Sequence, residues 1–143
     1  MTKQTQLTTL DTAQYILDQL DKDTKIEVAK VYALIYLAEV YSRQQYNEPL
    51  HADTFINTAN YLPTPVKLEK IVSQYPNNDD KIFFHAGQNV GGVSVKMSDE
   101  DCHILDTIIS EYEGVSSQKI LPHIHRDAYF VSTGVGEEIT FEL

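Results

Sequence analysis

A run of eight apolar residues inside a long helical pattern constrains the fold more than any other feature of this sequence. The run covers residues 31–38 and reads VYALIYLA. A helix that is apolar on every side has to be buried on every side. Asp23-Thr24 followed by Glu27 is typical of an N-cap with its capping-box partner, and the helical pattern continues to about Tyr46. We therefore expect this helix to be the centre around which the others pack.

The length of 143 residues suits one domain with one core. An apolar fraction of 42% is close to that of globular proteins, so the chain as a whole does not have the composition of a disordered one. No apolar run reaches the roughly 20 residues of a membrane span, and the N-terminus lacks the apolar segment of a secretory signal. We expect a flexible N-terminus over 1–9, a single domain over 10–143 and a cytoplasmic location.

Capped and amphipathic segments predict further helices around the central one. Ser98 is a strong N-cap, because it precedes acidic residues that complement the helix dipole. Pro63 and Pro65 break the chain between two helices, and Pro122 favours a turn. The expected helices besides the central one cover residues 10–20, 52–60, 66–75, 98–112 and 116–121.

Short β segments are expected to interrupt these helices. Residues 81–85 and 92–97 have strand composition, and the glycines between them allow a tight connection. They predict a β-hairpin over about 81–97, and weaker alternation predicts short strands at 129–131 and 139–141. The expected fold class is mainly α, a compact helical domain around a buried central helix with an inserted β-hairpin. The alternative label is α+β.

The net charge of −10 lies mostly in the last third of the chain. From Ser98 to Leu143 there are ten Asp or Glu residues against Lys119 and Arg126, which gives −8. Nucleic-acid and anionic-membrane binding draw on clustered Lys and Arg, so neither is an expected partner. The charge fits a basic protein partner, because complementary charge accelerates the association of two proteins. It equally fits a solvated acidic surface that maintains solubility.

Few side chains have the pattern of a catalytic or metal site. The single cysteine, Cys102, has no partner for a disulfide or a zinc-binding thiolate pair. No nucleophile-elbow motif and no phosphate-binding loop is found. On a strand, His123 and His125 would point the same way and could hold a divalent ion with Asp127. We expect no cofactor and no enzymatic activity, with a metal-dependent enzyme built on this cluster as the alternative.

Nine tyrosines and no tryptophan make tyrosine the main aromatic residue. Tyrosine is favoured at interfaces, because it combines a large ring with a polar hydroxyl. Tyr32 and Tyr36 share one helix face and fit the core, whereas Tyr41 and Tyr46 fit an interface. A two-stranded hairpin cannot bury both faces alone, so its rings are interface candidates too. The predicted partner-binding residues are Tyr41, Tyr46, Phe83, Phe84, Glu111, Glu113, Asp127, Tyr129 and Phe130.

Five stretches of the chain follow one another in the order of a known family. They read TAQYIL at 12–17, KVYALIYLA at 30–38, YLPTPV at 61–66, MSDED at 97–101 and HIHRDAYF at 123–130. In this order and spacing the chain resembles the Panacea domain, also called the SocA-like antitoxin or phage-associated GepA domain. The positions that match the family motifs are Lys30, Tyr36, Tyr61, Pro63 and His125.

The resemblance implies a helical, non-enzymatic domain that binds and neutralises a toxin protein and is often encoded in prophages. A phage-encoded inhibitor of host defence is the alternative within the same binding class. In both cases the expected partner is a protein, either a toxin or a host or defence protein, with a basic surface as the complement to the acidic chain. The oligomeric state stays open.

Overall fold

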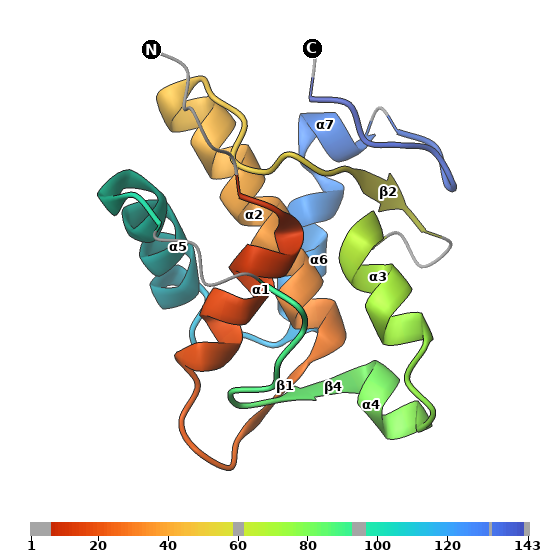
Figure 1. Cartoon of the computed structure of the whole chain (residues 1–143). Helices are drawn as coiled ribbons and strands as arrows, with labels where there is room; N and C mark the ends of the chain where they lie inside the picture. Colours follow the sequence, from red (N-terminus) through yellow and green to blue (C-terminus); the bar gives the residue numbers. More distant parts are fainter. Residues whose placement is uncertain (1–6, 59–61, 93–96, 132, 142–143) are drawn as a thin grey trace.

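The computed structural model describes residues 7–58, 62–92, 97–131 and 133–141, and Figure 1 shows their arrangement around one central helix. The described part is mainly helical with short strands, which confirms the expected fold class. Its elements are α1 (Thr9–Asp18), β1 (Lys25–Glu27), α2 (Val28–Tyr46), β2 (Phe55–Asn57), β3 (Pro63–Pro65), α3 (Val66–Ser73), α4 (Asn78–Ile82), β4 (Phe83–His85), α5 (Asp99–Glu111), α6 (Ser117–His125) and α7 (Ala128–Val131).

The central helix is α2, as predicted. Of its 19 residues 11 are buried, and within the apolar run 31–38 only Leu37 is not fully buried. The elements α1, α5, α6 and β3 all contact α2, which is therefore covered from several directions (Figure 1). Burial of one Val, Leu or Ile side chain contributes about 1.5–3 kcal/mol, so this helix is a principal source of stability. Within the described residues, no helix combines the length and the apolar character needed to cross a membrane.

The start of α2 differs from the prediction. Asp23 has a φ of 67°, so the chain turns there instead of beginning a helix. Lys25–Glu27 then form β1, and α2 begins at Val28 without a side-chain cap from Glu27. The predicted capping box is wrong because pairing of β1 with β4 holds these residues extended.

The strand predicted over 81–85 exists in part. Helix α4 continues to Ile82, and β4 keeps only Phe83–His85. β4 pairs antiparallel with β1, a segment far away in the sequence. The second strand of the predicted hairpin falls largely on residues 93–96, which lie outside the described part of the chain.

The segment predicted as a helix over 52–60 contains a strand instead. Residues 55–57 form β2, which pairs antiparallel with β3. The tail lies along the opposite edge of β2, where the Ile139 N–H donates to the Phe55 carbonyl at 2.9 Å. These pairings are made with distant segments, and they override the local helical pattern.

The C-terminal helices agree with the prediction only in part. Ser98 caps α5 as expected, because its Oγ accepts a hydrogen bond from the Asp101 N–H at 3.1 Å. The turn expected at Pro122 is wrong, since α6 continues through this residue to His125. The strand expected over 129–131 is wrong as well, because these residues form α7.

The N-terminal segment joins the fold earlier than expected. Leu7 is buried and its N–H donates to the Leu50 carbonyl at 3.2 Å. Thr8 then caps α1 in a capping box with Asp11. Folded structure therefore begins inside the segment 1–9 that was expected to be flexible.

A buried carboxylate joins α2 to the segment that follows it. Glu39 is 1% exposed, and its two oxygens accept hydrogen bonds from the N–H groups of His51 at 2.9 Å and Leu50 at 3.0 Å. The same carboxylate lies 3.0 Å from His51 Nδ1 and accepts from Arg43 Nε at 2.7 Å. Burial alone would raise the pKa of Glu39, but the interactions with His51, Leu50 and Arg43 lower it to about 2.

This buried ion predicts an acid-sensitive fold. The pKa of Glu39 in the folded protein, about 2, lies below the ordinary 4.5, so its stabilisation is complete above pH 4.5 and is lost as the pH falls toward 2. We expect this group alone to remove about 2–3 kcal/mol from the free energy of unfolding over that interval. Urea denaturation followed by circular dichroism at several pH values measures the loss.

Glu39→Gln tests the assignment. We expect this substitution to lower the free energy of unfolding by about 3 kcal/mol at pH 7, because the ionised partner of His51 and Arg43 is gone. For the same reason it should reduce the loss of stability at acidic pH. Glu111→Gln, which changes an exposed carboxylate of α5, is the matched control and should leave both quantities near wild type. An acid dependence in Glu39→Gln equal to that of the wild type would contradict this role.

Candidate functional site

A groove of about 620 Å³ lies between the C-terminal end of α1 with the chain that leads from it into β1, the first turns of α2 and the C-terminal end of α5. Three exposed carboxylates, from Asp21, Asp106 and Glu113, border it. The apolar side chains that line it are Ile16, Leu20, Ile26, Leu34 and Ile109. We call this site the α1–α2–α5 groove; it combines an apolar floor with an acidic rim.

Lys30 is the half-buried cation of this groove. It lies in the first turn of α2, next to the apolar run. Burial lowers the pKa of its ammonium group, while the carboxylates of Glu27 and Glu113 act in the opposite direction. The charge of Lys30 is therefore matched by acids of the protein itself.

A hydrogen bond links the two outer helices of the groove. The Tyr15 hydroxyl on α1 donates to Asp106 Oδ1 on α5 at 2.6 Å. Burial, this hydrogen bond and the charge of Asp106 all raise the pKa of Tyr15, so the hydroxyl stays protonated and continues to donate at neutral pH. The bond joins α1 to α5 beside the groove, where both helices also pack on α2.

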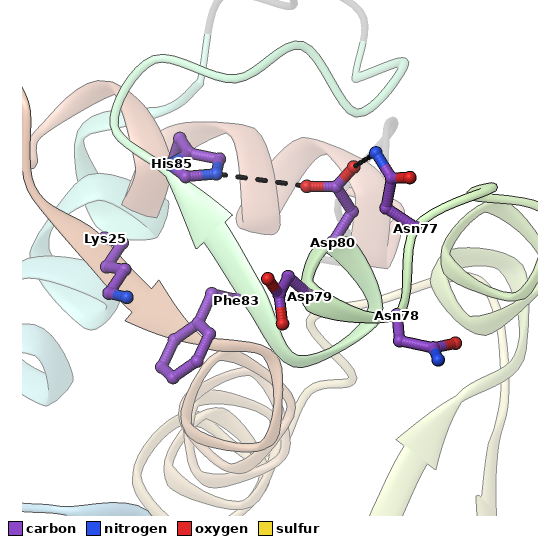
Figure 2. A pocket seen from close by; sticks show the side chains of 7 residues that line it. All are labelled: Lys25, Asn77, Asn78, Asp79, Asp80, Phe83 and His85. Carbon is purple, nitrogen blue, oxygen red and sulfur yellow. Dashed lines mark hydrogen bonds and ion pairs between the residues drawn. The ribbon is translucent and has the colours of Figure 1, made fainter.

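A more polar hollow of about 560 Å³ adjoins the groove at Lys25, which lines both (Figure 2). The Lys25 ammonium lies 4.3 Å from the centre of the Phe83 ring. On the other side, Asp80 is 4.0 Å from His85 Nε2 and accepts a hydrogen bond from the Asn77 side chain at 3.3 Å. Lys25, Asn77, Asp80 and His85 therefore already interact with other side chains of the hollow.

The residues predicted to bind a partner fall in several places. Tyr41 and Tyr46 pair at the C-terminal end of α2, with ring centres 6.3 Å apart, and Tyr46 is 37% exposed. Glu111 and Glu113 are both exposed at the end of α5, and Glu113 lines the groove. Of the predicted set, Glu113 is therefore the residue that belongs to the groove.

Two predicted interface rings are buried. Phe84 is fully buried and Phe130 is 4% exposed, so neither ring is available to a partner. Phe83 is half-buried and packs under Lys25 (Figure 2). The prediction failed for Phe84 because β4 packs on the core beside β1 instead of protruding as a hairpin.

Asp127 and Tyr129 stabilise the packing around the tail. Asp127 Oδ1 accepts hydrogen bonds from the Tyr36 hydroxyl at 2.6 Å and the Tyr129 N–H at 3.0 Å. Burial and then this hydrogen bond raise the pKa of Tyr36. The Tyr129 ring lies 5.3 Å from that of Phe141. Both predicted interface residues thus have partners within the protein.

The metal hypothesis depends on a geometry that the fold does not have. His123 and His125 lie on helix α6, where residues two apart point to different sides. His125 stacks on Phe130 at 5.4 Å, and Asp127 bonds Tyr36. Across residues 7–58, 62–92, 97–131 and 133–141, no three His, Cys, Asp or Glu side chains are grouped so that they could hold a metal ion. The alternative site is therefore contradicted.

One arrangement with catalytic composition was missed at the sequence level. Thr12 Oγ1 lies 2.7 Å from His51 Nε2, and His51 Nδ1 lies 3.0 Å from Glu39. A hydroxyl, an imidazole and a carboxylate in this order resemble a nucleophile with its base and orienting acid. All three side chains are buried, so the Thr12 hydroxyl is not exposed at the surface of the protein. Glu39, a charged residue directly after the apolar run 31–38 of α2, was the signal that could have revealed it.

The family-motif positions lie in different parts of the fold. Tyr36 and Pro63 are buried, His125 is exposed on α6, and Lys30 lines the groove. Tyr61 lies outside the described residues.

Comparisons with protein-family models, with curated proteins and with solved structures give no match. The resemblance to the Panacea family therefore stays a prediction. The function has to be inferred from the groove and from the charge of the chain.

The environment of Lys30 predicts a measurable titration. We expect its pKa to lie below the ordinary 10.5, because burial disfavours the charged form. Glu113→Gln should lower this pKa further, because the Glu113 carboxylate favours the charged form. Titration of the Lys30 Cε signal by NMR, assigned with Lys30→Arg, gives both values. A higher pKa in Glu113→Gln than in the wild type would contradict the placement of these two side chains.

Proposed function

We propose that this protein is a non-enzymatic binding domain that captures another protein in the α1–α2–α5 groove. The observation that supports this proposal is the combination, in one groove, of an apolar floor with exposed carboxylates. The apolar surface supplies affinity, because a partner removes it from water. The carboxylates select the partner and accelerate its encounter.

The partner is proposed to be basic. The net charge of −10 disfavours acidic proteins and nucleic acids as partners. The exposed acids Asp21, Asp106 and Glu113 extend this charge to the groove itself. A basic protein would therefore be attracted by the net charge at long range and would pair its basic side chains with the carboxylates of the groove at short range.

The biological setting follows from the family resemblance. An antitoxin-like protein would hold a toxin inactive in the cytoplasm by occupying its surface. A phage-encoded inhibitor of host defence would use the same groove in the same way. Neither role needs a catalytic group or a cofactor, and the test below identifies the partner.

The test is capture of the partner by the tagged full-length protein from cells of the native host, or from cells that carry the neighbouring genes. We expect one stoichiometric basic protein, identified by mass spectrometry and released by raised salt concentration. Glu113→Lys, which reverses a charge at the groove, should reduce its recovery at least tenfold.

Glu138→Lys is the matched control. It makes the same charge change at an exposed position of the tail, beside β2. Circular dichroism checks that both variants are folded. Equal recovery of the partner with wild type and both variants would contradict binding in the groove. An equal loss of the partner with both variants would show that binding depends on the net charge of the protein and not on the position of the charge.

A further inference from the structure

The last described residues, 133–141, form a tail that lies along the edge of β2 opposite β3 (Figure 1). The Asn57 N–H donates to the Glu137 carbonyl at 3.0 Å. Two residues further along the tail, the Ile139 N–H donates to the Phe55 carbonyl at 2.9 Å. The tail therefore pairs with β2 in the manner of a short antiparallel strand.

An aromatic residue of the tail fills a cage of side chains from α2, β2 and α7. The centre of the Phe141 ring lies 5.3 Å from that of Tyr129 and 5.9 Å from that of Tyr36. It lies 6.0 Å from the centre of the Phe55 ring, and the Arg43 guanidinium covers its face at 4.3 Å. Aromatic and cation–π contacts of this kind are favourable. We call this cage, together with the paired edge of β2, the tail site.

The turn that brings the tail back to β2 carries an energetic penalty. Gly136 has a φ of 85°, a conformation that residues other than glycine rarely adopt. Beside it, the Asn57 side-chain amide donates to the Thr133 carbonyl at 2.9 Å. The Oδ1 atom of the same amide is buried and, among the described residues, accepts no hydrogen bond. A buried acceptor without a donor is unfavourable, and opening of the turn would let water reach it.

An opened tail leaves apolar surface that has to be covered again. Ile139 is 3% exposed and Phe55 is 1% exposed while the tail is closed. Both would meet water if the tail left, so the hydrophobic effect favours the capture of another tail. The tail of a second copy has the same sequence, and it can remake the contacts of the closed arrangement apart from those of the turn.

We infer that the tail site accepts residues 137–141 of a second copy, so that two copies exchange their tails and form a dimer. The turn at Gly136 is the hinge, which extends instead of folding back. Each tail site of the dimer is then completed by Phe141 of the other chain. This inference goes beyond the proposed function, because none of the tail-site residues named above lines the α1–α2–α5 groove.

The charge of the protein distinguishes this dimer from the capture of a basic partner. The net charge of −10 opposes the association of two copies. Salt screens this repulsion, so we expect the dimer fraction to increase with salt concentration. Binding of a basic protein in the groove should respond in the opposite direction.

Gly136→Val tests the hinge. A Cβ at this position would meet no atom of the described residues within 4 Å, so valine opposes the closed turn through its φ and not through a clash. An extended hinge accepts valine. We expect the dimer association constant, measured by size-exclusion chromatography with light scattering, to rise at least about tenfold. Adding Phe141→Ala should return this variant to the monomer, because the cage loses its occupant.

Gly87→Val is the matched control. Gly87 has a φ of 72° and similarly open space around a Cβ, but it lies in the loop after β4. We expect a comparable loss of stability and the dimer fraction of the wild type. Circular dichroism checks that each variant is folded, and Gly136→Ala, with its smaller side chain, takes the place of Gly136→Val if the latter does not fold.

A disulfide between chains shows whether the tails are exchanged. Ile56 and Glu138 are partners in an antiparallel bridge, and the bonds on either side of them make this a non-hydrogen-bonded pair. The Cα atoms of such pairs lie about 4.5 Å apart, within the range of a disulfide. In a background of Cys102→Ser and Gly136→Val, one protein carries Ile56→Cys and the other Glu138→Cys. Unfolded together in urea, refolded and oxidised, they should give a linked dimer on a non-reducing gel that neither protein gives alone.

A Gly136→Val protein that stays monomeric at every salt concentration would overturn the inference. A dimer without the mixed disulfide would overturn it as well, because the copies would then associate without exchange. If Gly136→Val stays monomeric and captures a protein that the wild type does not, a foreign segment occupies the tail site and the second copy is the wrong occupant. None of these outcomes bears on the groove, so the proposed function is tested separately.

Discussion

A helix with apolar side chains on every face has to be covered on every face, and the rest of this fold is arranged to satisfy that constraint. Helices α1, α5 and α6 and strand β3 all contact α2. The tail adds Phe141, whose ring lies 5.9 Å from that of Tyr36. Each covering element contributes one apolar face, so none of them needs to be long or apolar throughout. This explains why a chain of modest apolar content builds a single continuous core.

One charged group belongs to this core. Glu39 satisfies two backbone N–H groups, an imidazole and a guanidinium from inside the protein. An isolated buried carboxylate is strongly unfavourable, whereas one with several donors is tolerated and demands a specific arrangement of them. Glu39 thereby fixes the position of the segment that follows α2, which an apolar side chain could not do because it accepts no hydrogen bonds.

The sequence predicts the parts of the fold that depend on local pattern. The apolar run identifies α2 as the centre, and Ser98 with its acidic neighbours identifies the start of α5. It does not predict β1 or β2, nor that β4 pairs with β1, because strands of three residues are defined by the distant backbone they pair with. The candidate site is even harder to predict from the sequence. Lys30 and Glu113 could be singled out, but the groove forms only where distant segments pack together, and the Tyr15–Asp106 bond beside it joins residues 91 positions apart.

The strand β2 and the residues just before it form a seam shared by both extremities of the described chain. Leu7 pairs beside His51, and Glu138 pairs with Ile56 only a few residues later. A force that pulls the two extremities apart would therefore act on the same short stretch of backbone. The bridges of this stretch would break before the force reached the helices. None of the residues of this seam lines the groove between α1, α2 and α5.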